Sequence, residues 1–266
     1  MGRISEMLKS AEESGYTGDN LSAKVCQDIV LNAIARSTLN RNVTIKGGVV
    51  MREITGDVRR ATQDMDIDFI QYSLSDESID VFVHKLSVLE DISIKRVGDI
   101  TELSQQDYHG KRIFVEITDT DGISIQSKMD LGVHTHMDIE QEEFCFDIGY
   151  DDEGVSLLIN SKEQMFVEKL RSLLKFGAAS TRYKDIFDMY YLKDRVNTPK
   201  LERCISEFIL IDQGMKENNM SDIISRLERT FKSNRYRDRL AKSDKNWIGI
   251  DIDEALNGIM AFVTEI

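Results

Sequence analysis

The chain has 266 residues and a formal net charge of −13, with 30% charged and 8% aromatic residues. This length suits one large domain or two small ones, and the composition is that of an ordinary globular protein. No apolar run approaches the ~20 residues of a membrane-spanning helix, and so acidic a protein is not built for indiscriminate nucleic-acid binding. The polar N-terminus lacks the apolar core of a secretory signal, so we expect a cytoplasmic protein.

The first sixty residues predict helices around one short strand. Two helices are expected over residues 3–14 and 20–40, separated by Gly15 and Gly18. A strand at residues 44–45 then runs into the pair Gly47-Gly48. Residues 49–54 predict a brief helix that ends at Gly56.

An acidic strand is predicted next, over residues 64–72. Its carboxylates alternate strictly with apolar residues, the pattern of a strand with one buried face: Asp64, Asp66 and Asp68 against Met65, Ile67 and Phe69. A row of like charges on one face is costly unless a cation lies over it, and a divalent metal is the usual solution. A solvated face, or an edge strand protected by charge, is the simpler interpretation.

The middle of the chain completes a sheet. A helix is expected over residues 75–90, capped by Ser75. Strands are expected at 92–95, 113–118, 123–133 and 144–148, with a tight turn at 119–122 that favours a hairpin. Within 123–133 the apolar residues occupy odd positions, so Asp130 stands on the polar face of an otherwise buried strand.

The last third of the chain is predicted to be helical. Ser161 caps a helix at 162–176, where Lys169 lies inside the apolar stripe and must reach solvent or meet an anion. A helix at about 182–195 carries Asp185 and Asp188 on one face, and further helices are expected near 199–213, 219–233 and 251–263.

Basic residues are concentrated late in this helical region. From Arg226 to Lys245 there are eight Lys or Arg residues against three acids. The simpler interpretation is a solvated helical face that balances an acidic surface.

The Gly-Gly pair and the acidic strand together fit phosphate chemistry. Glycine lets the backbone approach a phosphate closely, and the N-terminus of the following helix favours an anion. Asp64 and Asp66 can then hold one or two Mg²⁺ ions on a nucleotide. Asp130, from a neighbouring strand, is the candidate third carboxylate and helps to deprotonate the nucleophile. Lys169 or Arg60 could supply the cation for a triphosphate.

At this point the sequence resembles a known family. Gly47-Gly48 followed by Arg60-x-Thr62-x-Asp64-x-Asp66 is similar to the nucleotidyltransferase fold shared with DNA polymerase beta. Glu163 to Leu170 (EQMFVEKL), then Arg182-x-Lys184-Asp185-x-x-Asp188, resemble the AbiEii/AbiGii toxin family. The resemblance spans about residues 40–195, and Gly-Gly stands where family members often have Gly-Ser.

The resemblance implies a fold, an activity and roles for residues. The expected fold is α+β: a mixed nucleotidyltransferase sheet with N-terminal helices over residues 1–160, then a helical domain over 161–266. The expected enzyme moves a nucleotide from an NTP to an acceptor, with RNA (tRNA) as the acceptor and Mg²⁺ or Mn²⁺ as cofactor. It would act as the toxin of a toxin–antitoxin or phage-defence system, with a cognate antitoxin protein as a partner and no membrane. By the same resemblance, Asp64 and Asp66 would bind metal, with Asp130 added as third ligand from its place on the neighbouring strand. The nucleotide would be bound by Lys46, Gly47, Gly48, Arg60, Thr62, Lys169 and Asp188. Lys169 would meet the triphosphate. Asp185 would match the later acidic motif, although Asp188 fits the same spacing.

Several alternatives stay open at this stage. Asp68 would face solvent or support the site from behind, Lys169 could be a snorkelling lysine, and Asp185 and Asp188 could simply pair with cations along their helix. The acceptor could be a protein hydroxyl, or the chain could be an inactive nucleotide- or partner-binding module. The choice of NTP is not readable from any motif.

Overall fold

The computed structural model describes residues 2–103, 110–136, 138–150 and 153–266. The chain forms two compact units, Met1–Asn160 and Ser161–Ile266. Within the described ranges, no helix combines the length and the apolar character needed to cross a membrane.

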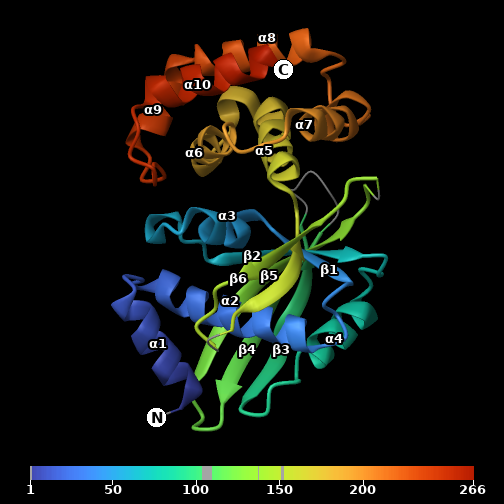
Figure 1. The fold of residues 1–266 in the computed structure, drawn as a ribbon, viewed down its shortest axis with the longest axis vertical. Coiled ribbons are helices and arrows are strands. Elements are labelled where there is room, and N and C mark those ends of the chain that lie inside the picture. Colours follow the sequence, from blue (N-terminus) through green and yellow to red (C-terminus); the bar gives the residue numbers. More distant parts are fainter. Residues whose placement is uncertain (1, 104–109, 137, 151–152) are drawn as a thin grey trace. The chain divides into compact units, whose positions relative to one another are not determined.

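A mixed sheet forms the centre of the first unit (Figure 1). In the described residues it has seven strands in the order β3-β4-β5-β2-β1-β7-β6. The strands are β1 (Val43–Lys46), β2 (Asp64–Ile70), β3 (Ile92–Glu102), β4 (Lys111–Asp119), β5 (Ser124–His134), β6 (Glu142–Phe146) and β7 (Val155–Ile159). Two pairings are parallel, β2 with β5 and β1 with β7, and the others are antiparallel.

Helices of the first unit pack against this sheet. They are α1 (Arg3–Glu13), α2 (Asp19–Arg36), α3 (Gly47–Thr55) and α4 (Asp76–Lys85), with a short turn η1 (Val58–Arg60). α2 contacts β5 and β7, α3 contacts β2, and α4 contacts β3. The side-chain oxygen of Ser75 accepts the amide of Ser78 and so begins α4, as the sequence predicts.

The two faces of β2 differ as the alternation predicts. Met65, Ile67 and Phe69 are at most 1% exposed. The ring of Phe69 lies 5.0 Å from that of Phe82 in α4, so α4 covers this apolar face. The acidic residues of β2 therefore project from the opposite face, because successive side chains alternate along a strand.

The predicted hairpin is also present. β4 and β5 pair antiparallel from Lys111↔Leu131 to Thr118↔Ser124. Gly122 closes the turn with a φ of 82°, and its amide donates to the carbonyl of Asp119. This hairpin brings β4 beside the strand that carries Asp130.

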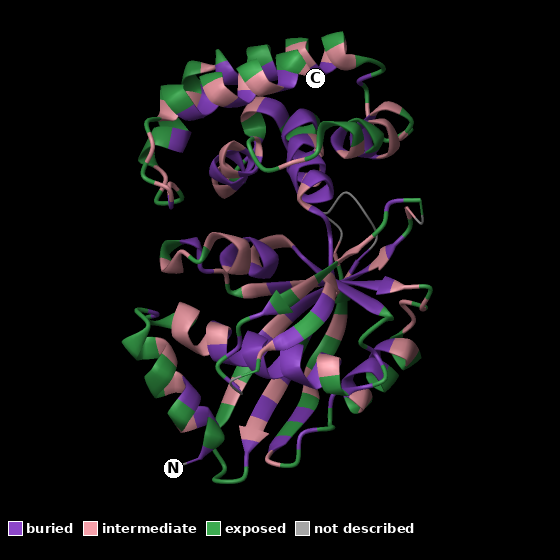
Figure 2. Ribbon diagram, viewed as in Figure 1, coloured by how far each residue is buried: buried purple, intermediate pink, exposed green. Residues whose placement is uncertain are grey.

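The second unit is helical. Its elements are α5 (Lys162–Phe176), η2 (Gly177–Ala179), α6 (Tyr183–Leu192), α7 (Thr198–Ile205), a π-helical turn η3 (Ser206–Leu210), α8 (Met220–Phe231), α9 (Asn234–Lys242) and α10 (Ile252–Glu265). α5 contacts α6, α7 and α8, and Figure 2 shows it as a largely buried helix. Its boundaries are those predicted, with the Ser161 hydroxyl accepting the amide of Gln164. The chain thus has the expected α+β fold.

Apart from the short η turns, one strand and one helix were not predicted from the sequence. β7 has five residues. It pairs in parallel with β1, which lies more than 100 residues earlier in the chain. Such a pairing leaves no local signal. α9 is separate from α8 because Ser233 caps a new helix by accepting the amide of Tyr236.

Candidate active site

Two carboxylates meet on the polar face of the sheet in the first unit. Asp66 on β2 is in register with Asp130 on the parallel strand β5, and Asp64 is in register with Lys128. Paired residues on adjacent strands project from the same face, so Asp66 and Asp130 lie side by side. The structure thus brings together two of the predicted metal-binding residues, with Asp64 two residues before Asp66.

Two cations that were not among the predicted site residues lie against Asp130 and Asp64. Arg112 on β4 forms two hydrogen bonds with Asp130, at 2.7 Å from Nε and 2.8 Å from Nη2. Lys128 Nζ lies 2.6 Å from Asp64 Oδ1. The hydrogen bond to Asp130 raises the pKa of Arg112, burial acts against it, and Asp64 and Asp66 add to the rise. All three aspartates therefore act on the same guanidinium.

Asp68 is not exposed to solvent, contrary to one of the two expectations. It is buried, and its Oδ1 lies 2.8 Å from Nζ of Lys46, which is buried as well. Lys46 is in register with Asp66 on the neighbouring strand β1. The Lys46–Asp68 ion pair therefore anchors the end of β1, directly before the Gly-Gly pair.

The two glycines bring the start of α3 close to the acidic strand. Gly47 has a φ of 65°, and a Cβ there would lie 2.2 Å from Asp66 Oδ2. A Cβ on Gly48 would lie 2.5 Å from Oγ1 of Thr62. Arg60, which lies in η1 two residues before Thr62, is buried. The glycines are thus required by two close approaches and one left-handed backbone conformation.

We expect Gly47→Ala to lower the rate of the nucleotide transfer that the resemblance implies by about 10²-fold, because it displaces the Asp66 carboxylate by an ångström or more. Initial rates with a labelled NTP measure this effect. Gly56→Ala is the matched control, since Gly56 has a φ of 61° at the other end of α3 and no atom within 4 Å of an added Cβ. Equal losses in both variants would mean that backbone strain, and not the contact with Asp66, is responsible.

The remaining predicted residues meet in the second unit. Lys169 Nζ on α5 lies 3.1 Å from Asp185 Oδ1 and 2.8 Å from Asp188 Oδ2, both on α6. All three are buried. The Arg182 guanidinium donates to Asp185 at 2.8 Å, and the Trp247 indole donates to Asp188 at 3.0 Å. Lys169 thus meets the anion that its place in an apolar stripe requires, and both aspartates take part.

The polar face of the sheet fits a magnesium ion by its donor type. Mg²⁺ is usually bound by one or two carboxylates together with substrate phosphates, and Asp66 and Asp130 supply two adjacent carboxylates. In the arrangement seen, no group of three or more His, Cys, Asp or Glu residues within the described ranges is placed to share a metal ion. Arg112 and Lys128 hold Asp130 and Asp64 instead.

Comparison with known proteins identifies the family. A family model described as "Nucleotidyl transferase AbiEii toxin, Type IV TA system" matches residues 29–257, most of both units. The chain belongs to the AbiEii nucleotidyl transferase toxin family. It is therefore a toxin-like nucleotidyltransferase, and its family implies a nucleotide substrate and an antitoxin partner.

A solved structure is also similar. The antibiotic-resistance factor ANT(2'')-Ia matches with 15% identity and a TM-score of 0.44, over 72% of this chain and 92% of that one. No protein with a curated description matches the sequence.

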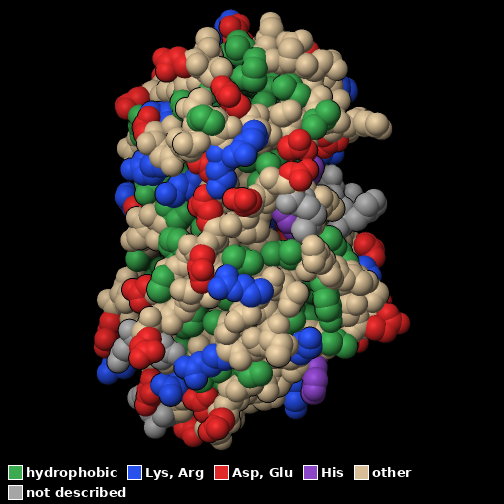
Figure 3. Space-filling model, turned by 45° about the vertical axis from the view of Figure 1, so that its right-hand side comes forward, with side chains coloured by type: hydrophobic (Ala, Val, Ile, Leu, Met, Phe, Trp, Pro, Cys, Tyr) green, Lys and Arg blue, Asp and Glu red, His purple; other side chains and the backbone are tan. Residues whose placement is uncertain are grey.

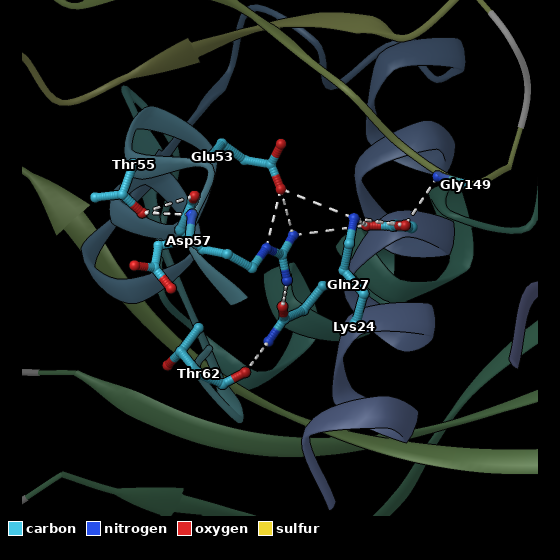
Figure 4. A network of polar contacts seen from close by, with 9 residues as sticks. Lys24, Gln27, Glu53, Thr55, Asp57, Thr62 and Gly149 are labelled. Atoms are coloured by element: carbon cyan, nitrogen blue, oxygen red, sulfur yellow. Dashed lines mark hydrogen bonds and ion pairs between the residues drawn. The ribbon is translucent and has the colours of Figure 1, made fainter. Parts of the chain in front are cut away.

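A polar network joins α2 to α3 and to the segment before β2 (Figure 4). The Gln27 amide on α2 accepts a hydrogen bond from Arg52 on α3 and donates to the Thr62 carbonyl at 3.0 Å. Arg52 is 2% exposed and also binds Glu53 at 2.7 Å. Gln27 is completely buried. Its side-chain amide links Arg52 of α3 to Thr62, the residue that packs on Gly48.

The other half of this network is centred on Asp28 of α2. Its carboxylate accepts from Lys24 Nζ at 2.6 Å and from the Gly149 amide at 2.9 Å, and it lies 3.6 Å from Arg52. A buried carboxylate is tolerated only when it is paired and hydrogen-bonded in this way. The network therefore holds α3 against α2 within the first unit.

Gln27→Ala should destabilise the first unit by about 1–3 kcal/mol, because it leaves Arg52 and the Thr62 carbonyl each without one buried partner. It should also raise KM for the NTP, since Thr62 no longer holds Gly48 in place. Chemical unfolding and steady-state kinetics measure the two effects. Gln126→Ala, at an exposed position of β5, is the control. An unchanged KM in the destabilised Gln27→Ala variant would limit the network to a structural role.

Proposed function

We propose that this toxin-family enzyme transfers a nucleotide from an NTP to a hydroxyl of an RNA acceptor in a metal-dependent reaction. The observation that carries the proposal is the pair Asp66 and Asp130, in register beside the close approach of Gly47, in a chain that the family model matches.

The glycines and the carboxylates have separate tasks in this reaction. Gly47 and Gly48 let the backbone at the start of α3 approach the phosphates. Asp66 and Asp130, with Asp64, would hold Mg²⁺, which when bound neutralises charge on the phosphate oxygens. In the arrangement seen, Arg112 and Lys128 compensate the charge of Asp130 and Asp64.

The transfer is an in-line displacement at the α-phosphorus. The acceptor hydroxyl oxygen forms the new O–P bond, the bond to the bridging oxygen breaks, and pyrophosphate leaves. A carboxylate oxygen of Asp130 takes the proton of the attacking hydroxyl. Lys169 is proposed to meet the triphosphate, as the resemblance implies, although it lies between Asp185 and Asp188 in the second unit.

The test is a labelling reaction with total RNA and total protein as acceptors. Each of the four NTPs is supplied with the label on the α-phosphate, with Mg²⁺ or Mn²⁺. We expect the label in RNA for at least one NTP, lost on nuclease treatment, and no incorporation from the same NTP labelled on the γ-phosphate. Label in the protein fraction would identify a protein hydroxyl as the acceptor. No incorporation under any condition would contradict the proposal and favour an inactive binding module.

A further inference from the structure

A cavity of about 520 Å³ opens within the second unit. The end of α5, the segment before α8, and α8 from Asp222 to Arg229 form its walls. Its charged lining residues comprise four cations and two acids: Lys175, Lys216, Arg226, Arg229, Glu217 and Asp222. The lining residues therefore carry a formal net charge of +2, whereas the whole chain carries −13. Over the face drawn in Figure 3, by contrast, basic and acidic side chains are interspersed.

Both acidic residues that line the cavity accept hydrogen bonds from the segment before α8, which forms part of the cavity wall. Asp222 Oδ2 accepts from the Asn218 amide at 3.0 Å and from the Asn219 side chain at 3.2 Å. Glu217 is buried and accepts the amide of Lys216 at 3.2 Å. These bonds shape the segment before α8, so the carboxylates belong to the frame of the cavity.

One cation is held in a fixed position. Arg226 Nε donates to the Leu174 carbonyl in the last turn of α5 at 3.0 Å. Its guanidinium also lies against Gly177, where an added Cβ would be 2.7 Å from Nη2. A guanidinium anchored through Nε keeps further N–H donors for a planar anion such as a phosphate.

The other cations are exposed. Lys216 and Arg229 form no ion pair through their side chains with any residue in the described ranges, and Lys175 is exposed beside them. Many surface cations of this chain do pair, for example Arg59 with Asp57 and Lys232 with Glu228. The cavity therefore combines one fixed guanidinium with side chains that can adjust to a ligand.

Exposed apolar side chains lie close in sequence to the cavity. Phe176, which is 42% exposed, directly follows Lys175, and Ile211, which is 60% exposed, precedes the segment before α8. Cations combined with an accessible aromatic ring are the means by which proteins bind single-stranded nucleic acid, through the backbone and by base stacking.

We propose that this cavity binds phosphodiester groups of the acceptor RNA, and so serves as a docking site for RNA in the helical unit. The inference rests on the proposed function, because it takes RNA as the acceptor. It also divides the basic segment Arg226–Lys245, since Arg226 and Arg229 line the cavity and the cations of α9 do not.

The test compares two double variants of the full chain that change the net charge equally. Lys216→Glu/Arg229→Glu reverses two cavity cations, and Arg239→Glu/Lys242→Glu reverses two exposed cations of α9. Binding of bulk tRNA is measured by filter binding from 50 to 200 mM salt, with thermal unfolding as a check of folding. Loss of two phosphate contacts should raise Kd at least about ten-fold and reduce the slope of log K against log salt by about 1.4–1.8. The α9 variant should bind within about two-fold of the native chain.

The outcomes separate this inference from the proposed function. Equal losses in both variants, or no loss in the cavity variant, would overturn the docking site, whereas RNA labelling by the native chain would still support the transferase. Binding of inorganic phosphate without binding of RNA would also overturn it. If the cavity variant is unstable, Lys216→Gln/Arg229→Gln replaces it. We expect this variant to reduce the slope of log K against log salt by the same amount. A native chain that neither binds nor labels RNA would contradict both proposals.

Discussion

Asp66→Ala should abolish nucleotide transfer, with a rate lower by about 10³-fold or more, while the first unit stays folded. Asp66 is in register with both Lys46 and Asp130, and its carboxylate lies against Gly47. Its removal takes away the central carboxylate of the polar face. Stability should not fall, because Asp64 and Asp130 keep their partners Lys128 and Arg112 and one like charge is gone.

Three measurements check this result. Initial rates with an α-labelled NTP give the loss of transfer, thermal unfolding gives the stability, and electron paramagnetic resonance of Mn²⁺ gives metal affinity without turnover. Asp80→Ala, at an exposed residue paired with Arg96, is the control and should leave all three unchanged. Full transferase activity in a folded Asp66→Ala variant would refute the mechanism.

The faces of the acidic strand could be predicted from local sequence, but the partners of its residues could not. Strict alternation separated Met65, Ile67 and Phe69 from the aspartates, because each strand residue points to the face opposite its neighbours. The pairing of Asp66 with Asp130 depends on a parallel register between strands about sixty residues apart. No local pattern encodes such a register.

The missed cations show the same limit. Arg112 on β4 directly precedes Ile113, and Lys128 on β5 directly precedes Met129. Ile113 and Met129 are buried on the apolar face, so the two cations point to the opposite face. That alternation is readable from the sequence: it places Lys128 on the polar face with Asp130, and it would have placed Arg112 there as well. Their particular partners follow only from the register of three strands, which a single sequence does not supply.

Lys169→Met should lower the free energy of unfolding of the second unit by about 3–5 kcal/mol, because it leaves two carboxylates near each other without their shared cation. Asp188 is completely buried, and after the change only the Trp247 indole remains among the contacts described above. Trp247 is the single tryptophan of the chain, so its fluorescence during denaturation reports on this site. Lys242→Met, at an exposed residue of α9, should change stability by less than about 0.5 kcal/mol. A Lys169→Met variant as stable as the native chain would contradict the prediction.

A double variant separates stability from catalysis at this position. Lys169→Met/Asp188→Asn removes two of the three buried charges, and the third, on Asp185, keeps Arg182 at 2.8 Å. We expect it to be more stable than Lys169→Met alone, because no buried carboxylate that has lost its lysine remains at position 188 and the asparagine oxygen can still accept from Trp247. If transfer is slower than in the native chain even in the restabilised protein, with a raised KM for the NTP, Lys169 acts on the triphosphate. If transfer returns with stability, the buried cluster serves to fix α5 against α6, and the cation for the triphosphate must be sought among other residues.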